Sequence, residues 1–356
     1  MSAPAPVRPG DTGIDAPTTV PAPATTPASD TDTAAEKRRA RLRATGRLAL
    51  AIGNRLLDIV LVLWAAATLA FIALQLIPGD PLDRLMAGIQ DATPEMRAAI
   101  SAHYGLDQPV FVQYLQFLAH AAVFDFGTSY QRAAPVTEVL LSELPATLEL
   151  TFWAMTLAVV VAILLALATS GRGRIGRAIA VGLELVSVSV PSFWLGIVLM
   201  TVLSFQLRLL PAFGANGPAS LVLPVITLAV PLAGVLSQVL RERMEHALHE
   251  PFVTTLRARG LTESGIRSGH VLRHAALPAL TLTSVIFGSL LSGTVIIETL
   301  FSRPGLGRVA VAAVQDRDIP LVLGFVVFAA FVFIVLNTIV DLVAPLLDPR
   351  SRGSRA

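Results

Sequence analysis

Residues 250–278 read EPFVTTLRARGLTESGIRSGHVLRHAALP, a long polar stretch in the C-terminal half of a chain that is otherwise largely hydrocarbon. The stretch predicts two short helices around a glycine. Pro251 suits the first turn of a helix, because its missing N–H costs nothing there. Gly260 follows as a stop that can adopt a positive φ, and Thr262 can cap a second helix. A basic loop that carries a short helix with a small apolar face indicates docking against another protein.

The composition of the whole chain is that of a membrane protein. Of its 356 residues, 54% are hydrophobic and only 15% are charged. The mean hydropathy of +0.68 lies outside the range of soluble globular proteins. No Cys is present, which excludes disulfides and thiolate metal sites. We therefore predict an all-α polytopic membrane protein.

Six apolar segments are long enough to cross a bilayer, which needs about 20 residues. They cover about 55–77, 147–169, 178–203, 221–240, 279–300 and 321–343. Six spans put both termini on one side, and the basic residues decide which side. With the termini inside, the cytoplasmic segments hold 20 Lys and Arg residues and the outer segments hold 7. This bias predicts cytoplasmic termini and a cytoplasmic loop at 241–278.

The segments outside the spans also have predicted properties. Residues 1–46 form a Pro-, Ala- and Thr-rich tail that ends in a basic segment, and we expect disorder because large apolar side chains are nearly absent. A solvated tail is favoured over a partner-binding one. Residues 47–350 form the membrane domain, and 351–356 form a cytoplasmic tail. The extracytoplasmic loop, 78–146, is too long for a simple connector. We expect it to contain short helices and to pack over the outer mouth as a small cap.

Ionisable groups give little sign of chemistry in this chain, and we predict neither a metal site nor a catalytic site. His246 with His249 and His270 with His274 have helical spacing suited to metal, but no carboxylate completes either set. Solvated or docking-face histidines are favoured. Glu184 is the one acid expected at mid-depth in a span, whereas a proton relay needs several such groups. We expect Glu184 to face the bundle interior, hydrogen-bonded to a neighbouring helix.

Prolines and small residues interrupt several spans, at Pro191 with Ser192 and then at Pro224 and Pro231. Kinks and close helix contacts account for this pattern. Kinked helices that line a translocation path have the same pattern, so both interpretations stay open. The candidate pathway or kink residues are Pro191, Ser192, Pro231 and Glu184.

An ordered set of motifs between about residues 55 and 350 resembles the permease subunit of bacterial ABC importers, in the dipeptide/oligopeptide/nickel branch. The set is LIPGDP at 76–81, YGLDQP at 104–109, DFG at 125–127, PSFWLG at 191–196, LPAFG at 210–214, RARGL at 257–261, ETLFSRPGLGR at 298–308, RDIP at 317–320 and LDPR at 347–350. Each motif is weak alone, whereas the ordered set is specific.

The resemblance implies a type I ABC importer permease fold with six transmembrane helices. In that fold, the loop seats a short coupling helix in a groove of the ATPase subunit. The implied contact residues are Thr254, Thr255, Leu256, Arg257, Ala258, Gly260 and Leu261. The general motif begins Glu-Ala-Ala, where this chain has Thr254, Thr255 and Leu256. The distance from Gly260 to Pro278 is also longer than in the general pattern.

The resemblance also implies a function and partners. The function is translocation of short peptides, or a related solute such as nickel chelates, across the cytoplasmic membrane. The partners are a second homologous permease subunit, two ABC ATPase subunits that bind ATP and Mg²⁺, and an extracytoplasmic solute-binding protein. This chain is expected to be neither an enzyme nor a nucleic-acid binder, and to hold no cofactor.

Two other classes of protein are alternatives to an ABC importer permease. An ion-gradient-driven secondary transporter often has intramembrane charges and inverted repeats, and the sequence offers one candidate charge and no convincing repeat. A membrane-embedded enzyme has less support, because no nucleophile–base set lies at a plausible depth.

Overall fold

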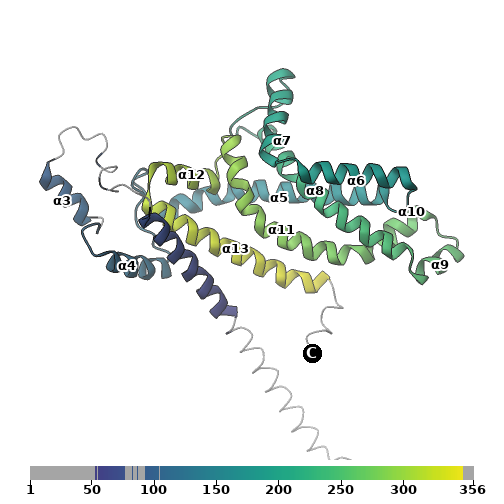
Figure 1. Ribbon diagram of the computed structural model, residues 1–356, viewed down its shortest axis with the longest axis horizontal. Coiled ribbons are helices and arrows are strands. Elements are labelled where there is room, and N and C mark those ends of the chain that lie inside the picture. Colours follow the sequence, from purple (N-terminus) through teal and green to yellow (C-terminus); the bar gives the residue numbers. More distant parts are fainter. Residues whose placement is uncertain are drawn as a thin grey trace, which may run out of the picture. The chain divides into compact units, whose positions relative to one another are not determined.

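The computed structural model describes residues 53, 55–76, 82, 86, 93–103 and 105–347, and within these residues no β-strand is present. The all-α fold class is thus confirmed, while the predicted tails at 1–46 and 351–356 lie outside the described residues. The helices (Figure 1) are Arg55–Gln75, α3 Pro94–His103, α4 Val110–Ala122, α5 Val136–Thr169, α6 Arg174–Ser189, α7 Ser192–Leu199, η1 Met200–Gln206, α8 Ala219–Leu248, α9 Pro251–Ala258, α10 Glu263–Gly265, η2 Ile266–Val271, α11 Leu272–Leu300, α12 Leu306–Asp316 and α13 Ile319–Leu347.

Four helices of the described chain are long and apolar enough to cross a membrane: Arg55–Gln75, α5, α8 and residues Ile319–Ile339 of α13. The pair formed by α6 and by α7 with η1 makes a fifth if it counts as one span. The remaining predicted span, 279–300, falls within α11, and part of the side chains of that helix lie outside the description. The count of six spans therefore stays a prediction.

The predicted span at 178–203 consists of two helices joined at a sharp bend. α6 ends at Ser189 and α7 begins at Ser192, with Val190 extended between them at φ −81° and ψ 121°. Proline disfavours the helical conformation of the residue before it, so the Val190–Pro191 dipeptide ends the helix. The two halves differ in direction by 97°.

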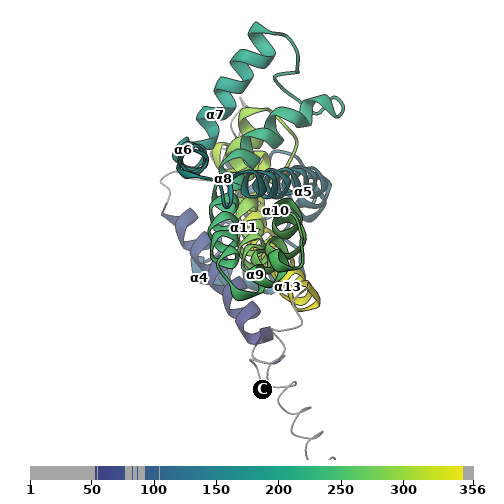
Figure 2. The same ribbon diagram turned by 90° about the vertical axis from the view of Figure 1, so that its right-hand side faces the viewer.

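α8 runs without interruption through Pro224 and Pro231, whereas the sequence analysis expected both to break a span. The reason lies in its packing. α8 lies between α5 and α6 and also contacts α11 (Figure 2), and 56% of its most apolar window is buried. Contacts on these sides hold the helix although each proline removes one backbone hydrogen bond.

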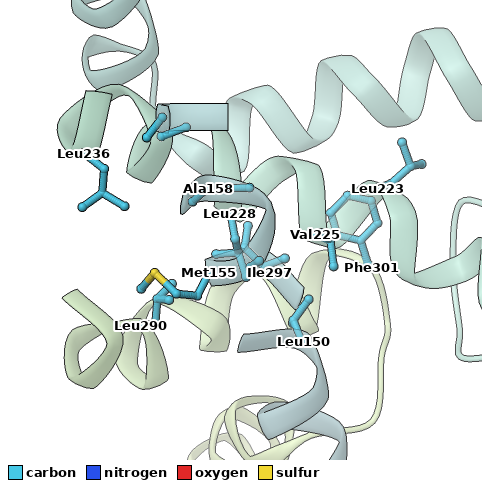
Figure 3. Close-up of a cluster of buried hydrophobic side chains, with 14 of the residues drawn as sticks. Leu150, Met155, Ala158, Leu223, Val225, Leu228, Leu236, Leu290, Ile297 and Phe301 are labelled. Carbon is cyan, nitrogen blue, oxygen red and sulfur yellow. The ribbon is translucent and has the colours of Figure 1, made fainter. Parts of the chain in front are cut away.

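The central core of the bundle joins α5, α8 and α11. Leu150 and Met155 of α5, Leu228 of α8 and Ile297 of α11 belong to one buried cluster (Figure 3). α7 approaches this cluster through Gly196, where a Cβ would stand 2.8 Å from the side chain of Leu300. Interiors packed in this way transmit displacement from one element to the next.

Two further buried clusters lie along the long helices. One joins the beginning of α5 to α12 and α13. The other joins the end of α5 and the end of α8 to α9, η2 and the start of α11. Figure 1 shows α12 and the α9–α10 segment at different ends of the bundle. The ends of the long helices α5 and α8 therefore position residues 250–278.

Candidate coupling site

The polar stretch identified in the sequence folds into α9, α10 and the π-helical turn η2. Pro251 occupies the first position of α9, and Gly260 follows its end at φ +79°. A Cβ on Gly260 would meet no atom within 4 Å. The backbone conformation, and not a lack of space, is therefore what requires glycine at this turn.

Two side-chain interactions close the turn after Gly260. The backbone N–H of Gly265 donates to Thr262 Oγ1 at 3.3 Å. Arg257 Nε donates to Glu263 Oε1 at 2.7 Å, and Arg257 Nη2 donates to Oε2 at 3.3 Å. This hydrogen bond lowers the pKa of Glu263 and raises the pKa of Arg257. Because both side chains are about half exposed, the pair orients the turn and adds little stability.

The underside of the segment is part of the protein core. Val253 of α9 and Ile266 and Val271 of η2 are fully buried, in one cluster with Met244 of α8 and Ala166 of α5. Close by, the ring of Phe252 stacks on that of His274, with centroids 4.8 Å apart. These contacts fasten α9 to the ends of two long helices, so that a displacement of α9 reaches α8 and α5 directly.

The residues predicted as coupling contacts divide into two groups. The exposed ones are Thr254, Thr255, Arg257, Ala258 and Gly260. Leu256 and Leu261 are half-buried and pack against the cluster beneath α9. We call the exposed group the α9 surface. It is a solvent-facing surface above a buried apolar cluster.

Glu184 of α6 faces the protein interior and is paired with Arg241 of α8. Arg241 Nε donates to Oε1 at 3.0 Å and Arg241 Nη2 donates to Oε2 at 2.7 Å. Ser237 Oγ donates to Oε1 at 3.0 Å. The two charged side chains are 5% and 7% exposed, and this bidentate geometry is what allows such burial. The interior orientation was expected. The partner was missed, although the arginine at the end of the next span was a signal for it.

Further charged contacts between α6 and α8 adjoin this ion pair. Arg241 Nη1 lies 3.4 Å from Glu245 Oε1, and Arg177 Nη2 lies 3.6 Å from Glu245 Oε2. A cleft of about 470 Å³ adjoins them, and His246 and His249 are among its lining residues. Within the described chain, no three His, Cys, Asp or Glu side chains stand together as metal ligands.

A second buried network holds the segment after α11. Thr147 Oγ1 donates to Glu298 Oε1 at 2.7 Å, and the N–H of Gly307 donates to Oε2 at 2.7 Å. The N–H of Leu306 donates to Thr147 Oγ1 at 2.9 Å. A Cβ on Gly305 would collide with the Glu298 carboxylate. The sequence predicted no role for these residues beyond the motif at 298–308. Gly305 and Gly307, which follow Glu298 in the chain, were the sequence signal that a side chain lies close to the backbone here.

Asp318, which lies between α12 and α13, acts in the same way. It is fully buried, and its Oδ2 accepts from Ser129 Oγ at 2.5 Å and from the N–H of Gln131 at 3.2 Å. Oδ1 accepts from the N–H of Leu321 at the start of α13, at 3.3 Å. The carboxylate thereby ties the turn before α5 to the first turn of α13.

The remaining candidate pathway or kink residues do not gather around the cleft between α6 and α8. Pro191 is exposed and Ser192 half-buried, both at the bend between α6 and α7, while Pro231 is half-buried within α8. Glu184 is enclosed by its ion pair. None of the four lines the cleft. The structure thus brings together the coupling candidates but not the pathway candidates.

Nearly all of the membrane domain is similar to known proteins. Residues 142–353 match the family described as "Binding-protein-dependent transport system inner membrane component", and residues 50–151 match the N-terminal family of such membrane components. A glutathione transport system permease protein, GsiC, of Salmonella choleraesuis (strain SC-B67) is 35% identical over 300 residues, which cover 84% of this chain and 97% of that protein. A Brucella abortus (strain 2308) protein named as a peptide transport system permease is 34% identical over 308 residues, with coverage of 84% and 98%.

Among solved structures, one described as an amino acid ABC transporter with histidines is 20% identical, with a TM-score of 0.45. It covers 60% of this chain, and 94% of that structure is matched.

Proposed function

Because this chain belongs to the binding-protein-dependent transport system inner membrane components, as the permease subunit of an ABC importer, we propose that its α9 surface docks on an ATPase subunit. The chain is a multi-pass protein of the cytoplasmic membrane, and its family works together with ABC ATPases and solute-binding proteins. The observation that supports the docking role is the contrast between the exposed α9 surface and the buried residues beneath it.

The proposed mechanism is mechanical. Closure of the ATPase subunits on ATP moves α9, and the cluster around Val253 and Met244 passes this movement to α5 and α8. Packed helices rearrange between discrete states instead of deforming continuously. The bundle therefore switches between outward-open and inward-open arrangements, while ATP hydrolysis takes place on separate subunits.

The substrate and the assembly are part of the same proposal. The relatives named for glutathione and for peptides favour a short peptide as the transported solute. A second, homologous permease subunit completes the translocation path. In this arrangement six spans put both termini and the 241–278 loop in the cytoplasm, and residues 78–146 lie largely on the outer side.

The test is co-purification from native membranes in mild detergent. In the test variant, Thr254, Thr255 and Arg257 are replaced by alanine, while the buried contacts of Leu256 and Leu261 stay intact. The matched control replaces Gln238, Glu242 and Arg243, which are exposed on α8. We expect wild type and control to bring down the ATPase subunits and the α9 variant to lose them. Equal recovery with the α9 variant would reject the docking surface.

A further inference from the structure

α4 is a helix of unusual composition for a segment expected outside the membrane. Its 13 residues, VFVQYLQFLAHAA, contain no Asp, Glu, Lys or Arg, and none of them is buried. Phe111 is 69% exposed and Leu115 is 48% exposed. A charge-free helix with large exposed apolar side chains needs something that covers them.

The contacts of α4 place it beside apolar parts of the spanning helices. Tyr114 Oη lies 2.8 Å from Thr68 Oγ1 in the helix Arg55–Gln75. The ring of Phe71 lies 5.4 Å from that of Tyr114 and 6.2 Å from that of Phe117. At 1.5 Å per residue, Thr68 and Phe71 stand about 11 and 6 Å before the end of their helix. α4 therefore packs alongside this span and not above its end.

The segment that follows α4 reaches a second candidate span. The ring of Phe124 meets the ring of Phe331 of α13 edge-on, with centroids 4.8 Å apart. Phe331 lies well inside the apolar window Ile319–Ile339. The middle of α4 and the segment just after its end are thus packed against two helices that are long and apolar enough to cross a membrane.

α4 has three distinct faces. Its packed face carries Tyr114, Phe117, Leu118 and Ala121, which are half-buried. Its exposed surface divides into an apolar stripe, Phe111, Leu115 and Ala119, and a polar stripe, Gln116 and His120. At about 100° per residue, the centres of the two stripes lie about 120° apart around the helix axis. An exposed surface divided in this way is typical of a helix at a water–lipid boundary.

The apolar stripe adds to an exposed apolar surface on the neighbouring candidate span. The helix Arg55–Gln75 has only 11% of its most apolar window buried, and Leu69 on it is 68% exposed. We propose that α4 is embedded in the membrane beside this helix, with Phe111 and Leu115 among the acyl chains and Gln116 and His120 toward water. The choice of the outer leaflet rests on the topology proposed above. In this arrangement α4 is a lipid-contacting element and not part of a cap over the outer mouth.

The chain contains no Cys, so a single introduced Cys is the only site in it that a thiol-reactive spin label can modify. Single variants Phe111→Cys and Leu115→Cys are compared with the matched pair Gln116→Cys and His120→Cys, and Leu69→Cys serves as the lipid-facing reference. Each full-length protein is spin-labelled and reconstituted in phosphatidylethanolamine/phosphatidylglycerol vesicles. Collision rates with oxygen, which concentrates in lipid, and with a water-soluble nickel chelate are then measured. We expect the oxygen-to-nickel ratio at positions 111 and 115 to match that at 69 and to exceed that at 116 and 120 severalfold.

Two results would overturn the proposal. A high nickel collision rate at 111 and 115, equal to that at 116 and 120, would place α4 in water. Low collision rates with both reagents at 111 and 115 would mean that protein, and not lipid, covers the apolar stripe. Repeating the measurement with and without the solute-binding protein would then show whether that protein is the one in contact. Labelling of Gln116→Cys in intact cells by an impermeant maleimide tests the leaflet separately. Labelling only after permeabilisation would reject the proposed topology, while the collision ratios still report the depth.

Discussion

At the scale of single residues, buried carboxylates join segments that lie far apart in the sequence. Glu184 is neutralised by a guanidinium, whereas Glu298 and Asp318 accept hydrogen bonds from hydroxyls and backbone N–H groups. A buried charge is tolerated only where such partners are present. Each of these acids therefore fixes the position of the segments that supply its hydrogen-bond donors.

We predict that Glu184→Ala strongly destabilises the bundle. It leaves Arg241 charged and buried, which costs about 3–5 kcal/mol. Thermal unfolding in detergent measures the effect. Glu245→Ala is the control, because Glu245 is more exposed and its contacts are 3.4 and 3.6 Å long, so its loss costs about 0–1 kcal/mol. The double variant Glu184→Ala/Arg241→Ala should lose less than the sum of its single variants. Strict additivity would show that the two side chains are not coupled.

At the scale of elements, α9 and the turn after it depend on backbone conformation at one position. Gly260 has φ +79° and free space around its Cα. A non-glycine residue in such a conformation costs about 1–3 kcal/mol, and a β-branched one resists it most. The strain that a substitution at this position introduces is therefore confined to the turn, because the buried side chains of α9 are unchanged.

We predict that Gly260→Val inserts in the membrane at wild-type levels but loses uptake, because the turn that positions the α9 surface is strained. Gly173→Val is the matched control. Gly173 likewise has no atom within 4 Å of a Cβ, but its φ is −61°, which valine adopts freely. Uptake of radiolabelled peptide and the amount of protein in the membrane are measured together. Full uptake by a well-expressed Gly260→Val protein contradicts the role given to the turn.

The Arg257–Glu263 pair predicts how this turn responds to pH. The pKa of Glu263 is lowered in the folded state by its hydrogen bond to Arg257. A carboxyl with a lowered pKa contributes its stabilisation above its ordinary pKa of about 4.3, and that contribution is lost as the pH falls through the lowered value. Hydrogen exchange of the residue 259–265 amides, corrected for intrinsic rates, should therefore be constant from pH 8 to about 5. Glu263→Gln should speed exchange throughout that range. A midpoint near neutral pH in the wild type would assign the protection to another group.

At the scale of the whole molecule, α5 connects the two ends of the mechanism. Thr147 near its beginning belongs to the Glu298 network, and Ala166 near its end belongs to the cluster beneath α9. The two residues are about 29 Å apart along a straight helix. Movement of α9 can therefore reach the far network through α5, without any covalent step in this chain.

We predict that Glu298→Gln separates transport from assembly. When the amide oxygen accepts from the Gly307 N–H, the amide NH2 faces Thr147 and the Thr147 hydroxyl can no longer donate to this side chain, at a cost of about 1–3 kcal/mol. Uptake should fall, while ATPase subunits still co-purify, because the α9 surface lies elsewhere. The control is Glu143→Gln, whose carboxylate is 20% exposed and 3.6 Å from Arg132. Loss of the ATPase subunits together with uptake would mean that the network supports the whole bundle.

What the sequence alone determined is the class of the protein and its local signals. Hydrophobic segments of membrane-spanning length, the proline before Ser192 and the glycine at 260 act through nearby backbone and solvent, so they can be read from short stretches. Tertiary structure decided the pairing of Glu184 with Arg241 and the continuity of α8 through Pro231. It also decided the hydrogen bonds from residues 306–308 to Thr147 and Glu298. They depend on contacts between residues up to 159 positions apart, such as Thr147 with Leu306. Which acid meets which partner follows from how the helices pack, and packing is a property of the assembled bundle, not of any single segment.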